Sequence, residues 1–331
     1  MSARMSSIVL QQLETYGPDR CEALDYDAAS AYVGRLVREQ YENFTVVSWF
    51  LPKHLRRDFG HVYAFCRWAD DLGDETGDRR KSLELLEWWR GELSLCYEGK
   101  PRHPVFVALR RTIDEHDIPR KPFDDLIDAF VQDQRVNRYD TWEQVLDYCT
   151  RSADPVGRLV LYLAGHRDEP RQRLSDATCT ALQLANFWQD VRRDVLERDR
   201  VYLPRDVAGR HGLDIDVMVK AIRQDEAAKQ ATAKCRACPP AASMHALGDP
   251  FRATVKELTQ RTWPLFERGR ELWPQLAKDI RLDVKLFTWG GEAVLKMIER
   301  QDYDTLSHRP SVGGLRKAGL MLRGLAGKWI G

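Results

Sequence analysis

Residues 62–77 read VYAFCRWADDLGDETG, and this stretch decides the fold. An aromatic-rich run with apolar residues at helical spacing leads directly into Asp70, Asp71 and Asp74. Like charges three or four residues apart on a helix repel each other, at a cost of a few tenths of a kcal/mol per pair. We therefore expect a positively charged group outside this helix to offset the repulsion.

A second acidic stretch lies at residues 182–204, which read LQLANFWQDVRRDVLERDRVYLP. Asn186, Asp190 and Asp194 recur every four residues, so they share one face of a predicted helix. Gln189 lies beside that stripe. The first stretch carries a similar stripe, made up of Tyr63, Arg67, Asp70 or Asp71, and Asp74.

Both acidic clusters follow apolar runs and do not alternate with lysines, which favours a pocket lining over a solvated charged face. Carboxylate and amide oxygens suit Mg²⁺, which binds through a few carboxylates and completes its shell with water and substrate phosphate. Two such stripes facing each other would hold a magnesium cluster and a diphosphate, with Arg67, Arg200 and Tyr202 donating to phosphate oxygens. The bound metal would neutralise charge on a departing diphosphate. A solvated surface remains the alternative.

The rest of the chain also predicts helices. Apolar residues recur at steps of three and four in residues 29–44, 80–99, 103–118, 121–136 and 142–150. Strict apolar–polar alternation is hard to find, and prolines fall between the periodic runs. We predict one all-α domain of roughly ten to a dozen helices over residues 28–331, after an N-terminal tail at residues 1–27.

Composition narrows the class of protein. Lysine plus arginine is 51 and aspartate plus glutamate is 50 in 331 residues, which gives no sign of a nucleic-acid partner. No run approaches the roughly 18 apolar residues of a membrane-spanning helix. Seven cysteines without an export signal predict reduced thiols and a soluble, cytoplasmic protein. Cys235 and Cys238 form a C-x-x-C before two prolines; we interpret them as ordinary cysteines, with a redox pair or half a zinc site as alternatives.

The two acidic stretches resemble the aspartate-rich motifs of a known family. YAFCRWADDLGDE (residues 63–75) is similar to the first motif of the squalene/phytoene synthases, and NFWQDVRRDVLERDRVYLP (residues 186–204) is similar to the second. The resemblance extends from Ala29 to Ile298. It implies an all-α isoprenoid-synthase-type bundle with a central active-site cavity.

Within the family, residues 41–75 and 147–165 most resemble the hydroxysqualene-forming enzymes of bacterial hopanoid biosynthesis. The resemblance implies conversion of presqualene diphosphate and water to hydroxysqualene and diphosphate, with Mg²⁺ and no nicotinamide cofactor. The metal would be a cluster of about two or three ions. The implied functional partners are a presqualene diphosphate synthase and a hydroxysqualene reductase.

The resemblance also implies roles for particular residues. The implied metal ligands are Asp70, Asp71, Asp74, Asn186, Asp190 and Asp194; of these, Asp71 and Asn186 would either ligate directly or orient ligands. Gln189 would ligate directly or orient a ligand, and the implied diphosphate contacts are Tyr63, Arg67, Arg200 and Tyr202. Further substrate contacts are expected at Phe44, Ser48, Thr150, Ser152 and Asp154. Aromatic candidates for stabilising a carbocation are Phe44, Trp49, Phe50, Phe65, Phe187 and Trp188, with ordinary helix packing as the alternative for each.

The segment YCTRSADPVG departs from the family pattern. Thr150 and Arg151 stand where squalene and phytoene synthases usually have an aromatic and a small residue. This departure argues against direct coupling of two prenyl diphosphates and fits a site that starts from a preformed cyclopropyl intermediate. Asp154 stands where asparagine is expected in the hydroxysqualene-forming group. Ser152 and Asp154, at a break before Pro155, are the candidates for holding the water.

Other interpretations remain open. A head-to-head prenyl transferase making presqualene diphosphate, squalene or phytoene is the second hypothesis, and a non-catalytic scaffold on the same fold is the third. The complete sets of aspartates disfavour the scaffold. Residues 315–331, LRKAGLMLRGLAGKWIG, combine basic and apolar residues and are compatible with peripheral contact at the inner membrane face; a terminal core helix fits equally.

Overall fold

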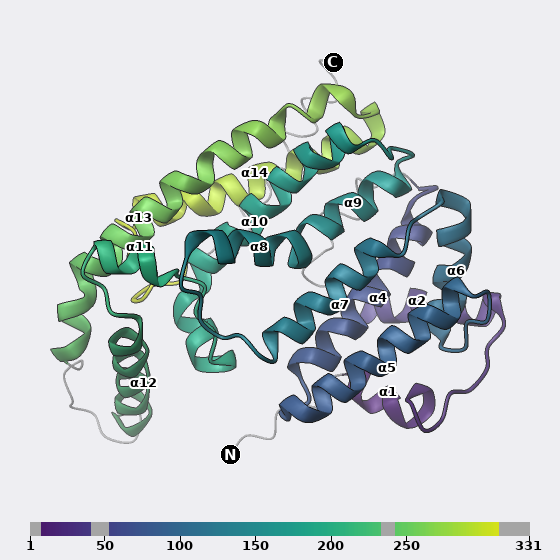
Figure 1. Cartoon of the computed structure of the whole chain (residues 1–331), viewed down its shortest axis with the longest axis horizontal. Helices are drawn as coiled ribbons and strands as arrows, with labels where there is room; N and C mark the ends of the chain where they lie inside the picture. Colours follow the sequence, from purple (N-terminus) through teal and green to yellow (C-terminus); the bar gives the residue numbers. More distant parts are fainter. Residues whose placement is uncertain (1–7, 41–52, 233–241, 311–331) are drawn as a thin grey trace. The chain divides into compact units, whose positions relative to one another are not determined.

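The computed structural model describes residues 8–40, 53–232 and 242–310. Regular structure over these ranges is helical (Figure 1), and the described residues form no β-strand beyond two isolated bridges. The predicted all-α class is therefore confirmed. Expected features at Phe44, Ser48, Trp49, Phe50, the C-x-x-C at 235–238 and the segment 315–331 lie outside the described residues.

The chain forms two compact units, which we describe one at a time. Unit 1 comprises Met1–Arg135, Thr150–Asp176 and Pro274–Asp283, and unit 2 comprises Val136–Cys149, Ala177–Trp273 and Val284–Gly331. The single domain expected over residues 28–331 stays a prediction.

The helices divide between the units along the chain. Those wholly in unit 1 are α1 (Ile8–Tyr16), α2 (Tyr26–Gln40), α4 (Arg56–Asp74), α5 (Arg79–Tyr97), α6 (Pro104–His116), α7 (Lys121–Asp133) and α9 (Asp154–Leu163). Those wholly in unit 2 are α11 (Arg205–Arg210), α12 (Ile215–Thr232) and α13 (Ala242–Arg270). Three helices contribute residues to both units: α8 (Trp142–Ser152), α10 (Glu169–Arg198) and α14 (Lys278–Arg300).

Helix α4 is the central helix of unit 1. It packs against α2, α5, α6 and α7, and its Phe65 and Trp68 are fully buried. Trp68 stacks on Trp89 with ring centroids 5.3 Å apart, and Phe65 contacts the Phe123 ring edge to face at 4.9 Å. Burying one such side chain contributes on the order of 1.5–3 kcal/mol, which is why this aromatic run fixes the position of the acidic residues that follow it.

In unit 2, the second half of α10 packs closely against α13 and α14. The indole Nε1 of Trp188 donates to Thr262 Oγ1 at 3.0 Å, and both side chains are buried. Gly291 of α14 lies so close to α10 and α13 that a Cβ at this position would be 2.6 Å from the side chains of both Leu182 and Phe266. The absence of a side chain at Gly291 therefore allows this close packing.

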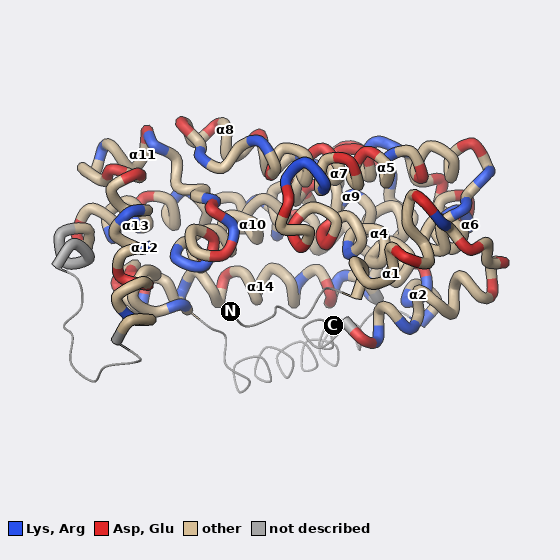
Figure 2. Tube along the Cα trace, turned by 90° about the horizontal axis from the view of Figure 1, so that it is seen from below, with Lys and Arg blue, Asp and Glu red and all other residues tan. Residues whose placement is uncertain are grey.

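Charges of both signs are interleaved along the helices (Figure 2), in keeping with 51 basic and 50 acidic residues in the sequence. Many pairs lie one turn apart on the same helix, such as Lys121 Nζ and Asp125 Oδ1 at 2.7 Å. None of the described helices is long and apolar enough to cross a membrane.

Candidate active site

The first acidic stripe occupies the second half of α4 in unit 1. Arg67 pairs with Asp71 one turn later, and its Nη1 lies 3.6 Å from Asp70 Oδ2. Asp71 is fully buried, whereas the Asp70 side chain is 40% exposed. Part of the positive charge expected from outside the helix is therefore supplied by Arg67 on the helix itself.

This geometry separates the roles of the three aspartates. Asp70 and Asp74 lie one turn apart and are only partly buried, so their carboxylates are accessible to a ligand. Asp71 is buried and pairs with the guanidinium of Arg67, whose side chain is 28% exposed. Of the two roles open to Asp71, the contacts favour orienting Arg67 over direct ligation.

The second stripe lies on α10 in unit 2. Asn186 is exposed, Asp190 and Asp194 are partly buried, and Gln189 is buried. Burial and the neighbouring Asp190 carboxylate together raise the pKa of Asp194 to about 7. A positive charge beside Asp194 would lower this pKa and favour its carboxylate form.

Two residues beyond α14 contact this stripe. The Arg309 guanidinium pairs with both carboxylate oxygens of Asp190, its Nη2 lying 3.1 Å from Oδ2. Gln189 Nε2 donates to the carbonyl oxygen of Pro310 at 2.5 Å. Neither residue could be identified from the sequence, because Arg309 is 119 positions from Asp190 and no local pattern marks it.

The predicted diphosphate contacts Arg200 and Tyr202 follow α10 directly. Both are largely buried, and the Tyr202 ring stacks on Phe187 with centroids 3.7 Å apart and an interplanar angle of 7°. Tyr139 stacks on Tyr202 at 5.7 Å. The stacking fixes the backbone and ring at this position, close in sequence to the acidic stripe.

The break expected before Pro155, where Ser152 and Asp154 are the candidates for holding the water, lies between two helices. Helix α8 ends at Ser152 and α9 begins at Asp154. Asp154 is 6% exposed, and Arg151 Nη2 donates to Gln132 Oε1 at 2.9 Å. The Ser152 hydroxyl is buried and has no hydrogen-bond partner among the described residues. A buried polar group of this kind is a suitable binding position for a water molecule.

Two of the aromatic candidates pack inside their own units. Phe65 is surrounded by Trp89, Phe106 and Phe123, and Trp188 is held by its hydrogen bond to Thr262. These contacts match the packing alternative for both residues. Phe187 differs, because its ring contacts Tyr202 and Tyr148 beside the second stripe.

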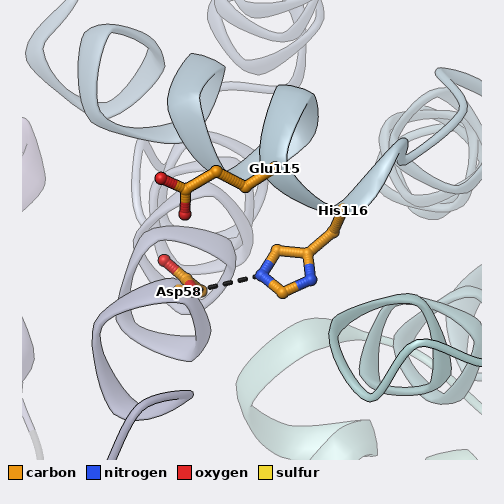
Figure 3. Close-up of side chains that lie close together, drawn as sticks. All are labelled: Asp58, Glu115 and His116. Carbon is orange, nitrogen blue, oxygen red and sulfur yellow. Dashed lines mark hydrogen bonds and ion pairs between the residues drawn. The ribbon is translucent and has the colours of Figure 1, made fainter.

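A separate acidic cluster joins α4 to α6 in unit 1. Figure 3 shows Asp58, Glu115 and His116 close together, with His116 Nε2 3.1 Å from Asp58 Oδ2. Arg57 Nε lies 2.8 Å from Asp58 Oδ1 and its Nη2 lies 2.6 Å from Glu115 Oε2. Arg111 Nε lies 2.6 Å from the other Glu115 oxygen. Arginines already satisfy both carboxylates, so we interpret the cluster as an ion-pair network and not as a metal site.

The two stripes, in contrast, fit the Mg²⁺ that the resemblance implies. All their candidate ligands are carboxylate or amide oxygens, the donors that Mg²⁺ prefers. Burial, and after it the neighbouring Asp190 carboxylate, raises the pKa of Asp194, and a divalent cation at the stripe would favour the ionised form of this carboxyl group.

Helical structure throughout the described regular elements and two aspartate-rich helix faces agree with the all-α fold of the isoprenoid synthases. The family model described as squalene/phytoene synthase matches residues 37–239, and the chain belongs to this family. The family indicated by the two motifs is therefore confirmed.

Among curated relatives, a hydroxysqualene synthase of Rhodopseudomonas palustris is 35% identical over 264 residues, covering 79% of this chain and 80% of the relative. A hydroxysqualene synthase of Zymomonas mobilis is 36% identical over 172 residues, covering 51% and 56%. Among solved structures, a squalene synthase of Alicyclobacillus acidocaldarius has a TM-score of 0.72 at 40% identity, covering 83% of this chain and 95% of that one.

Proposed function

We propose that this protein converts presqualene diphosphate and water into hydroxysqualene and diphosphate. Among the comparisons, the support is the similarity to hydroxysqualene synthases of several bacteria. In the structure, the observation that carries the proposal is the pair of complete acidic stripes on α4 and α10. On α4, Asp70 is 40% exposed and lies near Arg67. On α10, Asp190 and Asp194 are partly buried, and the backbone N–H of Arg200 bonds to the carbonyl oxygen of Asp194.

The proposed metal ligands are Asp70 and Asp74 on the stripe of unit 1, and Asn186, Asp190 and Asp194 on the stripe of unit 2. Mg²⁺ bound there supplies electrostatic stabilisation of the diphosphate leaving group. The protein's own donors would share this task. Arg67, fixed by buried Asp71, and Arg200, fixed beside the Phe187–Tyr202 stack, would donate to phosphate oxygens, with Tyr63 and Tyr202 as hydroxyl donors.

The proposed reaction breaks the carbon–oxygen bond to diphosphate, and both bonding electrons leave with the diphosphate. The cyclopropane ring of the remaining cation opens, and a water oxygen forms a bond to the cationic carbon. One water proton is then released to solvent. Ser152 and Asp154 are our candidates for holding this water, since both lie at the buried break between α8 and α9.

Similarity to phytoene synthases favours the second hypothesis, a head-to-head prenyl transferase. A phytoene synthase of Thermus thermophilus is 34% identical over 182 residues, covering 55% of this chain and 61% of the relative. Such an enzyme would join two prenyl diphosphates and not start from the cyclopropyl intermediate. The substrate therefore separates the two hypotheses.

Product analysis tests the proposal. Purified protein with Mg²⁺ is given presqualene diphosphate, with and without NADPH, beside a farnesyl diphosphate control. We expect hydroxysqualene from presqualene diphosphate, in equal amount with and without NADPH. Squalene formed only with NADPH, or turnover of farnesyl diphosphate alone, would contradict the proposal.

The proposed reaction also implies the enzymes that act before and after it, and the location of the protein in the cell. A presqualene diphosphate synthase must supply the substrate, and a hydroxysqualene reductase would consume the product. We propose a cytoplasmic enzyme with peripheral contact at the inner membrane face, because its substrate is an isoprenoid lipid. Fractionation of cells, followed by a salt wash of the membranes, tests this location.

A further inference from the structure

The turn after α10 has an unusual backbone at Asp199. This residue adopts a φ of +54°, in the left-handed region that favours glycine. The backbone N–H of Arg200 donates to the carbonyl oxygen of Asp194 at 3.1 Å. This bond spans six positions, one more than the hydrogen bond that usually ends a helix over a left-handed residue. An aspartate therefore occupies a position that glycine fills with less strain.

The side chain of Asp199 receives hydrogen bonds from three residues. Asn137 Nδ2 donates to Oδ2 at 3.0 Å, while Arg138 Nη2 and Arg223 Nη2 donate to Oδ1 at 2.8 and 2.5 Å. Arg138 Nη1 also donates to the backbone oxygen of Asp199 at 2.6 Å. A lone exposed ion pair would restrain the turn little, but these bonds converge on both carboxylate oxygens and on the backbone.

The same bonds join two segments that are distant in the sequence. Val201 N donates to the carbonyl oxygen of Asn137 at 3.0 Å, and Arg138 and Val201 form an isolated parallel bridge. On either side of Val201 lie Arg200 and Tyr202, the residues to which the proposed function gives diphosphate contacts. All the residues named here belong to unit 2.

We propose that Asp199 is a positioning residue that clamps the segment at Asn137 and Arg138 to the turn after α10 and thereby places Arg200 and Tyr202 for diphosphate binding. This inference rests on the proposed function for the role of those two residues. It adds a carboxylate that touches neither metal nor substrate and acts through the backbone that carries the donors. Hydrogen bonds from Asn137, Arg138 and Arg223 hold Asp199 in its strained backbone conformation.

The test variant is Asp199→Gly, which keeps the left-handed backbone and removes the carboxylate. The matched control is Asp302→Gly. Asp302 also follows a helix of unit 2 at positive φ, +51°, and pairs with a single arginine, Arg252 Nη1, at 3.3 Å. Asp199→Asn is the conservative variant, since asparagine tolerates the left-handed region and keeps one acceptor oxygen.

The first readout is the affinity of the full-length protein for inorganic diphosphate with Mg²⁺, measured by calorimetry. We expect Asp199→Gly to weaken it about 10-fold or more, with partial recovery in Asp199→Asn and no change in Asp302→Gly. The second readout is kcat/KM, expected to fall by a similar factor at an unchanged melting temperature. Should Asp199→Gly fail to fold, Arg223→Met removes one donor of the clamp and is expected to weaken diphosphate binding in the same direction.

Wild-type affinity for diphosphate in Asp199→Gly, or in Arg223→Met where that variant replaces it, would overturn the inference. So would an equal loss in Asp302→Gly, which would indicate a general effect on unit 2. If the wild-type protein binds no diphosphate, both the inference about Asp199 and the proposed role of Arg200 in diphosphate binding are wrong. The identity of the product is measured separately, so failure of the proposed reaction with intact diphosphate binding leaves this test decisive.

Discussion

At Asp70 and Asp71 two adjacent carboxylates have different surroundings. Asp71 is buried against Arg67, while Asp70 is 40% exposed and only loosely paired at 3.6 Å. Adjacent residues on a helix are about 100° apart around its axis, so one faces the interior and the other does not. The same amino acid therefore serves a structural role at one position and a proposed ligand role at the next.

The first prediction compares these neighbours. Asp70→Asn should lower turnover more than about 100-fold, because the amide is a poorer ligand for Mg²⁺, and leave the free energy of unfolding unchanged. Asp71→Asn should instead lower the free energy of unfolding by about 1–3 kcal/mol, because Arg67 loses a buried ionic partner. Kinetic assays and urea unfolding of both variants check this. Near-normal turnover in Asp70→Asn would contradict the metal assignment.

A buried histidine gives the second prediction, on pH. His61 on α4 bonds Thr112 on α6 at 2.8 Å, and burial lowers its pKa from 6.5 to about 4. The unfolded chain therefore binds a proton between pH 6.5 and about 4 that the folded protein does not. Stability should fall by about 3 kcal/mol as the pH drops through this window.

The measurement is urea unfolding between pH 4 and 7, compared with His61→Gln, which cannot take up a proton. The difference in unfolding free energy between wild type and variant should narrow steadily toward pH 4. A constant difference across the window would show that His61 titrates alike in the folded and unfolded protein.

At the scale of the element, the close packing of α14 gives the third prediction. A Cβ at Gly291 would lie 2.6 Å from Leu182 and from Phe266, whereas a Cβ at Gly290 would meet nothing within 4 Å. Gly291→Ala should therefore cost about 1–3 kcal/mol of stability through overpacking. Gly290→Ala, its neighbour on the same helix, should add about 0.5–1 kcal/mol by lowering the entropy of the unfolded chain. Thermal unfolding of both variants checks that Gly291→Ala lowers the stability and that Gly290→Ala raises it.

The helices themselves could be predicted from the sequence, and the roles of their faces only in part. Four-residue spacing identifies the stripe on α10, and Pro155 marks the break between α8 and α9, because both signals are local. Periodicity also marks Phe65 and Trp188 as buried residues. It does not say whether they contact other side chains or a substrate, since that depends on which helix lies opposite.

Side-chain contacts that join distant segments could not be predicted from the sequence. Arg309 reaches Asp190 across 119 positions, and Asp199 gathers donors from residues 137, 138 and 223. An aspartate after a helix and an arginine in a connecting segment are ordinary residues when viewed locally. Their roles arise only from the tertiary fold, which brings opposite charges together.

For the whole molecule, the fourth prediction concerns ligand-linked stability. If the stripes bind magnesium diphosphate, Mg²⁺ and inorganic diphosphate together should raise the free energy of unfolding by about 2.7 kcal/mol at a hundredfold excess over Kd. Asp70→Asn in unit 1 and Asp190→Asn in unit 2 should each reduce this stabilisation. Asp125→Asn, a helix-surface change in unit 1, is the control expected to retain it. Full stabilisation in either stripe variant would show that its stripe is not needed.

The contact between Arg309 and Asp190 has a consequence for the order of events during synthesis. Ribosomes add about 5–20 residues per second, so the 119 residues between the two take roughly 6–24 seconds to make. During that interval Asp190 is present in the nascent chain, while the arginine that will pair with it has not been made. A chain released before residue 309 would carry Asp190 and Asp194 without this counter-charge.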